Sequence, residues 1–202
     1  YLMYSAGTYG PGAFTDIFSV DRPARALVMI PAYGLFGETP FYYNLSAYVF
    51  RLLSAFAFFW LLNILWPRQN ALVFGASLLY LIYPGFLSQH NGIDYQSQMV
   101  SLAAALFSLA LSVKAAVMER GWRRFALFTL STLFGWLYLG LVEYFIGFEL
   151  FRWGCVFLLS SRTGGTLARK AWQTVRLAYP SLAVPGVFLI WRLFFFQSER
   201  GA

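Results

Sequence analysis

The composition of this chain is typical of an integral membrane protein. Of its 202 residues, 59% are hydrophobic and 11% are charged, whereas about 25% of the residues in a soluble domain carry a charge. The formal net charge of +7 does not indicate nucleic-acid binding, because the basic residues lie between apolar segments and not along one solvated face. The single cysteine, Cys155, excludes an internal disulfide bond.

One short apolar segment precedes the long ones. Ala26–Phe36 is only 11 residues long, which is too short to cross a bilayer and predicts an interfacial or re-entrant helix. The residues before it show no signal-peptide pattern. Because the chain also begins at Tyr1, we expect a fragment that lacks an upstream span.

Six longer apolar segments are predicted to cross the membrane as helices. A hydrocarbon core about 30 Å thick requires roughly 20 residues, each adding 1.5 Å. The apolar character is continuous on all sides, whereas a membrane β-barrel alternates with a period of two residues. The segments are Tyr42–Trp66, Ala71–Leu87, Tyr95–Met118, Phe125–Val142, Tyr144–Ser160 and Leu177–Phe196. We therefore predict an all-α, polytopic transmembrane helix bundle over residues 42–197, with about six spans. Residues 1–41 are expected to form an outer loop that includes the short interfacial helix.

The stretch from Phe125 to Ser160 has two alternative interpretations. As one helix its 36 residues would extend about 54 Å, too long for a single span. Either two short spans meet in a tight turn near Val142–Tyr144, or one span is followed by an interfacial helix.

The basic residues favour a reversal of the chain at Glu143. Cytoplasmic loops carry an excess of Lys and Arg, and with this reversal nine basic residues lie on one side and three on the other. The nine are Arg68, Lys114, Arg120, Arg123, Arg124, Arg162, Arg169, Lys170 and Arg176, and the three are Arg22, Arg25 and Arg200. Residues 112–124 and 161–176 are therefore predicted to be cytoplasmic.

The acidic residues show the opposite bias. Those expected on the outer side are Asp16, Asp21, Glu38, Asp94, Glu143 and Glu199, together with the only histidine, His90. They predict either an outer site where a carboxylate acts as a base or binds a divalent cation, or ordinary solvated loops. His90 and Asp94 alone make a poor metal site, because they are only two ligands of mixed type with Gly92 between them. No metal ligand is therefore assigned.

Three arginines are placed near the outer interface. Arg22 and Arg25 would share a helical face and grip a lipid phosphate through bidentate hydrogen bonds. The alternative is that Asp21 caps the following helix while these arginines anchor it among the headgroups. Arg192, near the outer end of the last span, has the same two interpretations.

Three further charged residues lie within predicted spans, where charge is costly and often functional. Glu149 and Arg152 are three residues apart, and this spacing favours a structural pair. Arg51 lies in the outer third of its span.

A series of short motifs in this order resembles a known family. The motifs are Asp21-Arg22-Pro23, Leu35-Phe36-Gly37, Arg51, Leu65-Trp66-Pro67, Tyr83-Pro84-Gly85-Phe86, Glu143-Tyr144-Phe145 and Trp191-Arg192. They resemble bacterial multi-spanning proteins related to the type C (GT-C) glycosyltransferases, the group of the protein O-mannosyltransferases and the aminoarabinose transferases. The resemblance extends over most of the chain and implies a location in the bacterial inner (plasma) membrane.

The resemblance also implies an activity, the transfer of a sugar from a polyprenyl-phosphate donor to an acceptor on the outer face. Asp16, Asp21 and Glu143 are then the candidate catalytic carboxylates. Tyr1–Thr15 contains none of the paired acids typical of the family's first outer loop, and we expect either that they lie just upstream of Tyr1 or that they are lost. Arg22, Arg25, His90, Asp94 and Arg192 are the candidate substrate-binding residues.

Two other functions fit the same sequence. One is a transporter or flippase subunit for a lipid-linked or anionic substrate, which should have broken helices and charges near the middle of the membrane. The other is a membrane scaffold without a ligand. The chain breaks and acidic residues lie toward the outer face, which favours the transferase.

Overall fold

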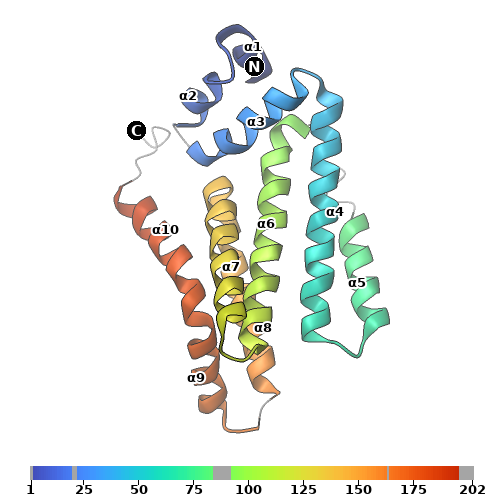
Figure 1. Ribbon diagram of the computed structural model, residues 1–202, viewed down its shortest axis with the longest axis vertical. Helices are drawn as coiled ribbons and strands as arrows, with labels where there is room; N and C mark the ends of the chain where they lie inside the picture. The colour runs from blue at the N-terminus through green and yellow to red at the C-terminus, as the bar shows by residue number, and fades with distance from the viewer. Residues whose placement is uncertain (1, 20–21, 84–91, 163, 196–202) are drawn as a thin grey trace.

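The structure, a computed structural model, describes residues 2–19, 22–83, 92–162 and 164–195, and every regular element in these ranges is a helix (Figure 1). Four helices are long and apolar enough to cross a membrane: Pro40–Leu65, Gly92–Val117, Trp122–Leu141 and Leu167–Phe194. The expectation of an all-helical membrane protein is therefore supported. The expected number of about six spans is not confirmed by this criterion.

Two predicted spans are shorter in the structure than in the sequence analysis. Helix α5 (Asn70–Ile82) has 13 residues and helix α8 (Gly147–Ser161) has 15. At 1.5 Å per residue they extend about 20 and 22 Å, less than a hydrocarbon core of about 30 Å. The end of the predicted span Ala71–Leu87 lies outside the described residues. Helix α8 follows a 3-10 turn, η3 (Glu143–Ile146).

Helix α6 (Gly92–Val117) forms the centre of the bundle. In its most apolar window 78% of the residues are buried inside the protein, against 33% for α4 (Pro40–Leu65) and 28% for α7 (Trp122–Leu141). Helices α4 and α7 pack on it from two sides (Figure 1). Small residues on α6, including Ala105 and Ser108, are fully buried and allow close approach of the neighbouring helices.

The helices alternate in direction. Helix α6 runs parallel to α4, while α5, on the side of α4 that faces away from α6, runs in the opposite sense (Figure 1). Ser101 of α6 donates to the Tyr138 carbonyl of α7, and Ser108 donates to the Ser131 carbonyl, so α6 and α7 are antiparallel. Helix α8 then doubles back along α7, because Glu149 lies beside Tyr138 and Arg152 beside Ser131. The predicted reversal at Glu143 is confirmed.

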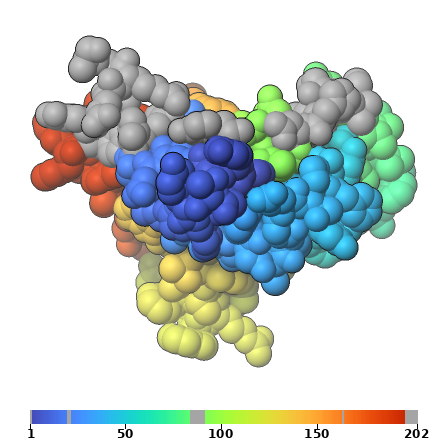
Figure 2. Space-filling view, turned by 90° about the horizontal axis from the view of Figure 1, so that it is seen from above, coloured from blue at the N-terminus to red at the C-terminus, as the bar shows by residue number. Residues whose placement is uncertain are grey.

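Three helices cover one end of the bundle, here named the α3 end. Helices α1 (Leu2–Tyr9), α2 (Ala13–Ser19) and α3 (Ala26–Phe36) lie there (Figure 2). The bounds of α3 agree with the predicted short helix. Much of the expected outer loop is therefore helical. Phe14, Phe18 and Met29 of these helices pack together in a small buried core that holds them in place. The C-terminal end of α10 (Ala183–Phe194) also lies at the α3 end (Figure 1).

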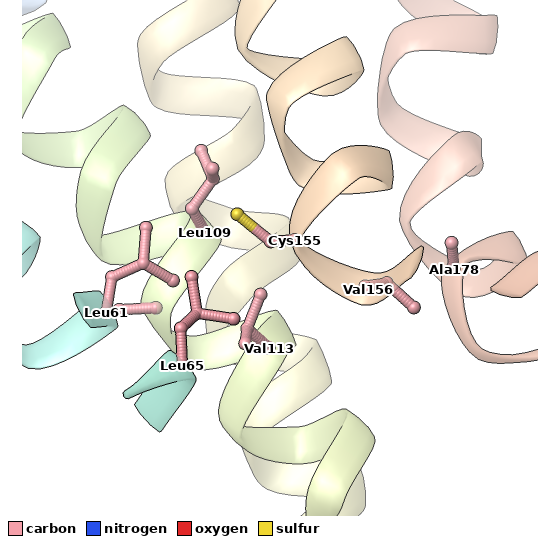
Figure 3. Packing of buried hydrophobic residues seen from close by; sticks show 8 residues of the cluster. Leu61, Leu65, Leu109, Val113, Cys155, Val156 and Ala178 are labelled. Atoms are coloured by element: carbon pink, nitrogen blue, oxygen red, sulfur yellow. The ribbon is translucent and has the colours of Figure 1, made fainter. Parts of the chain in front are cut away.

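The opposite end, here named the basic end, contains a second buried core. Leu61 and Leu65 of α4 pack against Leu109 and Val113 of α6 and against Cys155 of α8 (Figure 3). Arg162 donates a hydrogen bond to the Leu65 carbonyl, which joins the ends of α8 and α4. This end of the bundle is therefore held by packing between α4, α6 and α8.

Helix α9 (Leu167–Ala178) differs from the sequence prediction, which began the last span at Leu177. Thr166 caps its start by accepting a hydrogen bond from the Arg169 amide. A 3-10 turn that contains Pro180, η4 (Tyr179–Leu182), joins α9 to α10. Residues 167–176 of the basic segment are thus helical and continue through η4 into α10 within the candidate span Leu167–Phe194.

Candidate functional site

The turn η1 (Pro23–Arg25) places Arg25 beside the start of α6. Arg25 donates through Nε to the Ser97 hydroxyl, at 3.1 Å, and through Nη2 to the Asp94 carbonyl, at 3.0 Å. Its guanidinium carbon lies 4.7 Å from the centre of the Phe18 ring, within the range of a cation–π contact. Arg25 therefore joins α2, η1 and α6.

The turn after α7 carries the carboxylate of the site. Glu143 forms a salt bridge with Arg192 of α10, with 2.9 Å between Oε2 and Nε. The two side chains are 33% and 23% exposed, so the pair is accessible from outside. The Arg22 guanidinium lies 5.9 Å from the ring of Tyr144, the residue that follows Glu143. These contacts bring η1, η3 and α10 together at the α3 end.

The structure therefore gathers five of the eight predicted site residues into one region, here named the end cluster. Its members are Arg22, Arg25, Asp94, Glu143 and Arg192. Asp16 is an exposed residue of α2, and within the described chain no hydrogen bond or ion pair joins its carboxylate to the end cluster. Asp21 and His90 lie outside the described residues.

The end cluster suits an anion better than a cation. Three guanidinium groups accompany the Glu143 carboxylate and the Asp94 carbonyl, and arginine remains charged under all ordinary conditions. Among the residues that the structure describes, no group of three or more His, Cys, Asp or Glu side chains lies close enough to hold a metal ion.

A second polar group, which we name the buried network, lies inside the bundle. Arg152 is 2% exposed. It donates to both oxygens of Glu149, with Nε–Oε2 at 2.9 Å and Nη2–Oε1 at 3.0 Å. The Tyr138 hydroxyl also donates to Glu149. The predicted Glu149–Arg152 pair is confirmed.

Serines complete the coordination of Arg152. Its Nη1 donates to the Ser112 hydroxyl at 2.5 Å and to the Ser131 hydroxyl at 3.2 Å, while Nη2 donates to the Ser108 hydroxyl at 2.8 Å. Buried charges are tolerated when they are paired and hydrogen-bonded in this way. The network therefore holds α6, α7 and α8 together. Ser108 and Ser112 were not predicted as partners of Arg152, although they lie with Ser101 at helical spacing along one face of α6.

Arg51 also has a structural explanation. It is buried in α4 and donates to the carbonyls of Leu81 and Tyr83, the latter at 3.3 Å. The last carbonyls of a helix have no partner within that helix. Arg51 therefore satisfies the C-terminal end of the short helix α5, and its positive charge is favourable there.

Comparisons with known proteins do not identify a family. No protein-family model, no curated protein and no solved structure matches this chain. The resemblance to type C glycosyltransferases stays a prediction.

Proposed function

We propose that the chain crosses the membrane six times, with the α3 end outside and the basic end in the cytoplasm. The alternating directions of α4 to α10 support six passes. The short helix α5 packs on the longer α4, and Arg51 of α4 satisfies carbonyls at its C-terminal end. The end of the short helix α8 is tied to α4 by the hydrogen bond from Arg162 to the Leu65 carbonyl. The excess of Lys and Arg at the basic end supports this orientation.

We further propose that the intact protein binds a polyprenyl-phosphate sugar at the end cluster and transfers the sugar to an acceptor. The observation that carries this proposal is the convergence of Arg22, Arg25 and Arg192 with Glu143 from three separate segments. An anionic headgroup at the membrane surface requires permanent donors, and the planar guanidinium matches a phosphate. The end cluster lies at one end of the membrane-embedded bundle, so the polyprenyl chain of a bound donor can extend into the lipid beside the helices.

The Glu143–Arg192 pair can support both parts of the reaction. When the donor binds, its phosphate replaces the carboxylate as the partner of Arg192, and Glu143 becomes available as a base. The acceptor hydroxyl passes its proton to Glu143 while its oxygen forms a bond to the anomeric carbon of the sugar. The bond from that carbon to the phosphate oxygen breaks, and the polyprenyl phosphate leaves with its charge stabilised by the arginines.

The test is to replace Arg22, Arg25 and Arg192 together by lysine in the full-length protein. Lysine retains the charge that anchors a helix end among headgroups but loses the planar fork. We expect transfer from polyprenyl-phosphate sugar to fall by about 100-fold, as if about one hydrogen bond to a charged group were lost over the three sites together, while the amount of protein in the membrane is unchanged. Transfer is measured with a labelled donor in washed membranes.

Arg68→Lys is the matched control, because Arg68 is exposed at the basic end, and it should leave transfer unaltered. Full activity of the triple variant would contradict the role of the arginines. Donor binding by the unaltered protein without any transfer would instead favour the transporter or flippase function, and absence of donor binding would favour the scaffold.

A further inference from the structure

A groove opens between α7 and α9 at the basic end, far along the bundle from the end cluster. Its volume is about 1270 Å³, above the roughly 300–1,000 Å³ of small-molecule sites. Phe125, Phe128 and Trp136 of α7 form one wall, and Leu177 and Tyr179 belong to the other. The interior is therefore apolar and aromatic.

The groove has the length of one leaflet. Its α7 residues recur every three or four positions from Phe125 to Trp136, so they form a single helical face about 16 Å long. The hydrocarbon core of a bilayer is about 30 Å thick, and one leaflet is about half of that. Near Trp136, α10 packs closely on α7, since a Cβ atom at Gly135 would lie 3.3 Å from the methyl groups of Val184.

The mouth of the groove is basic. Arg120, Arg124 and Arg176 line it, and the described lining residues include no Asp or Glu. The Arg124 guanidinium lies 5.6 Å from the centre of the Phe128 ring, at the border between the basic mouth and the apolar interior. A molecule complementary to this surface has a negatively charged head and a long apolar tail.

We propose that this groove binds an anionic phospholipid of the cytoplasmic leaflet. The phosphate lies among Arg120, Arg124 and Arg176, and one acyl chain follows the α7 face toward Trp136. Basic pockets between transmembrane helices on the cytoplasmic side suit anionic headgroups, whereas a zwitterionic headgroup would bring a cation to the arginines. The proposal concerns a different end of the bundle from the end cluster and does not depend on the transferase.

The experiment measures phospholipid retention by native mass spectrometry of the full-length protein in detergent, with phosphatidylglycerol or phosphatidylcholine added. Arg120, Arg124 and Arg176 are replaced together by glutamine. We expect phosphatidylglycerol binding to weaken by about 100-fold, since each arginine near an anionic headgroup contributes about fivefold. The matched control replaces Arg68, Arg123 and Arg169, which are exposed basic residues outside the groove, by glutamine. This control variant has the same net charge as the groove variant, and its binding of phosphatidylglycerol should remain within about fivefold of that of the unaltered protein.

A second variant tests the apolar part of the groove. Thr129→Trp fills the interior while all three arginines stay, and it should also abolish retention of phosphatidylglycerol. Equal retention of the two phospholipids, equal loss in the two triple variants, or unchanged binding by Thr129→Trp would overturn the proposal. Displacement of phosphatidylglycerol by inorganic phosphate would assign the arginines to a free anion instead, and would also overturn it.

Discussion

Replacing Glu149 by leucine will destabilise the protein by about 3–5 kcal/mol, the usual cost of removing one partner from a buried ion pair. Arg152 is 2% exposed, so its charge would remain inside the bundle with only neutral oxygens as partners. An uncompensated arginine at the centre of a membrane helix costs at least about 2.5–3.5 kcal/mol by itself. The measurement is the free energy of unfolding, obtained by titrating the purified protein from mild detergent into dodecyl sulfate.

The double variant Glu149→Leu/Arg152→Leu separates charge from packing. Because both charges are then absent, we expect it to be more stable than Glu149→Leu alone by about 2 kcal/mol, as for other buried pairs replaced by apolar residues. Glu119→Leu is the control, since Glu119 is exposed in the turn between α6 and α7. Additive losses in the double variant, or a Glu149→Leu protein as stable as the control, would show that the network does not stabilise the bundle.

Glu143→Gln should give the largest loss of transfer, about 10²- to 10⁴-fold, the usual contribution of a positioned general base. The glutamine amide oxygen can still accept a hydrogen bond from Arg192, so the contact between η3 and α10 is retained while the basic group is lost. Binding of the polyprenyl-phosphate sugar should therefore remain close to that of the unaltered protein. The two measurements are transfer with a labelled donor and donor retention without acceptor.

The control for this variant is Glu38→Gln, an exposed acid of the same end, which should transfer normally. Asp94→Asn tests the carboxylate at the start of α6, whose main-chain carbonyl accepts from Arg25. Loss of transfer in Asp94→Asn with full activity in Glu143→Gln would show that the base is Asp94 of α6 and not Glu143 of η3. Full activity in both variants would remove the end cluster from the chemistry.

The sequence predicted those features that depend on local pattern. The bounds of α3 follow from a continuous apolar run that begins after Arg25 and ends before Gly37. Gly37 has a φ angle of +56°, which residues other than glycine rarely adopt. The reversal at Glu143 follows from length and from the distribution of basic residues, because a helix that is too long for the bilayer must turn back. The Glu149–Arg152 pair follows from helical spacing.

Features that depend on contacts between distant segments were not predicted. The partners of Arg51 lie about 30 residues further along the chain, and those of Arg152 on α6 lie 40 and 44 residues earlier. The hydropathy of a segment indicates whether its environment is apolar or polar, but not which other segment of the chain it contacts. Helix α9 was missed for a related reason, since its basic residues lower the mean hydropathy although Thr174 and Ala178 form a buried face.

The orientation of the bundle is the claim on which both the outer transferase site and the cytoplasmic lipid groove depend. Gly12 and Gly164 are matched positions for testing it, because both are exposed, lie at opposite ends of the bundle, and have no atom within 4 Å of an added Cβ. The native Cys155 is buried, so the unaltered protein gives the background. A membrane-impermeant maleimide added to intact cells should label Gly12→Cys at once and Gly164→Cys only after the cells are permeabilised. Strong labelling of Gly164→Cys in intact cells would contradict the orientation, and with it the outer placement of the end cluster and the cytoplasmic placement of the groove.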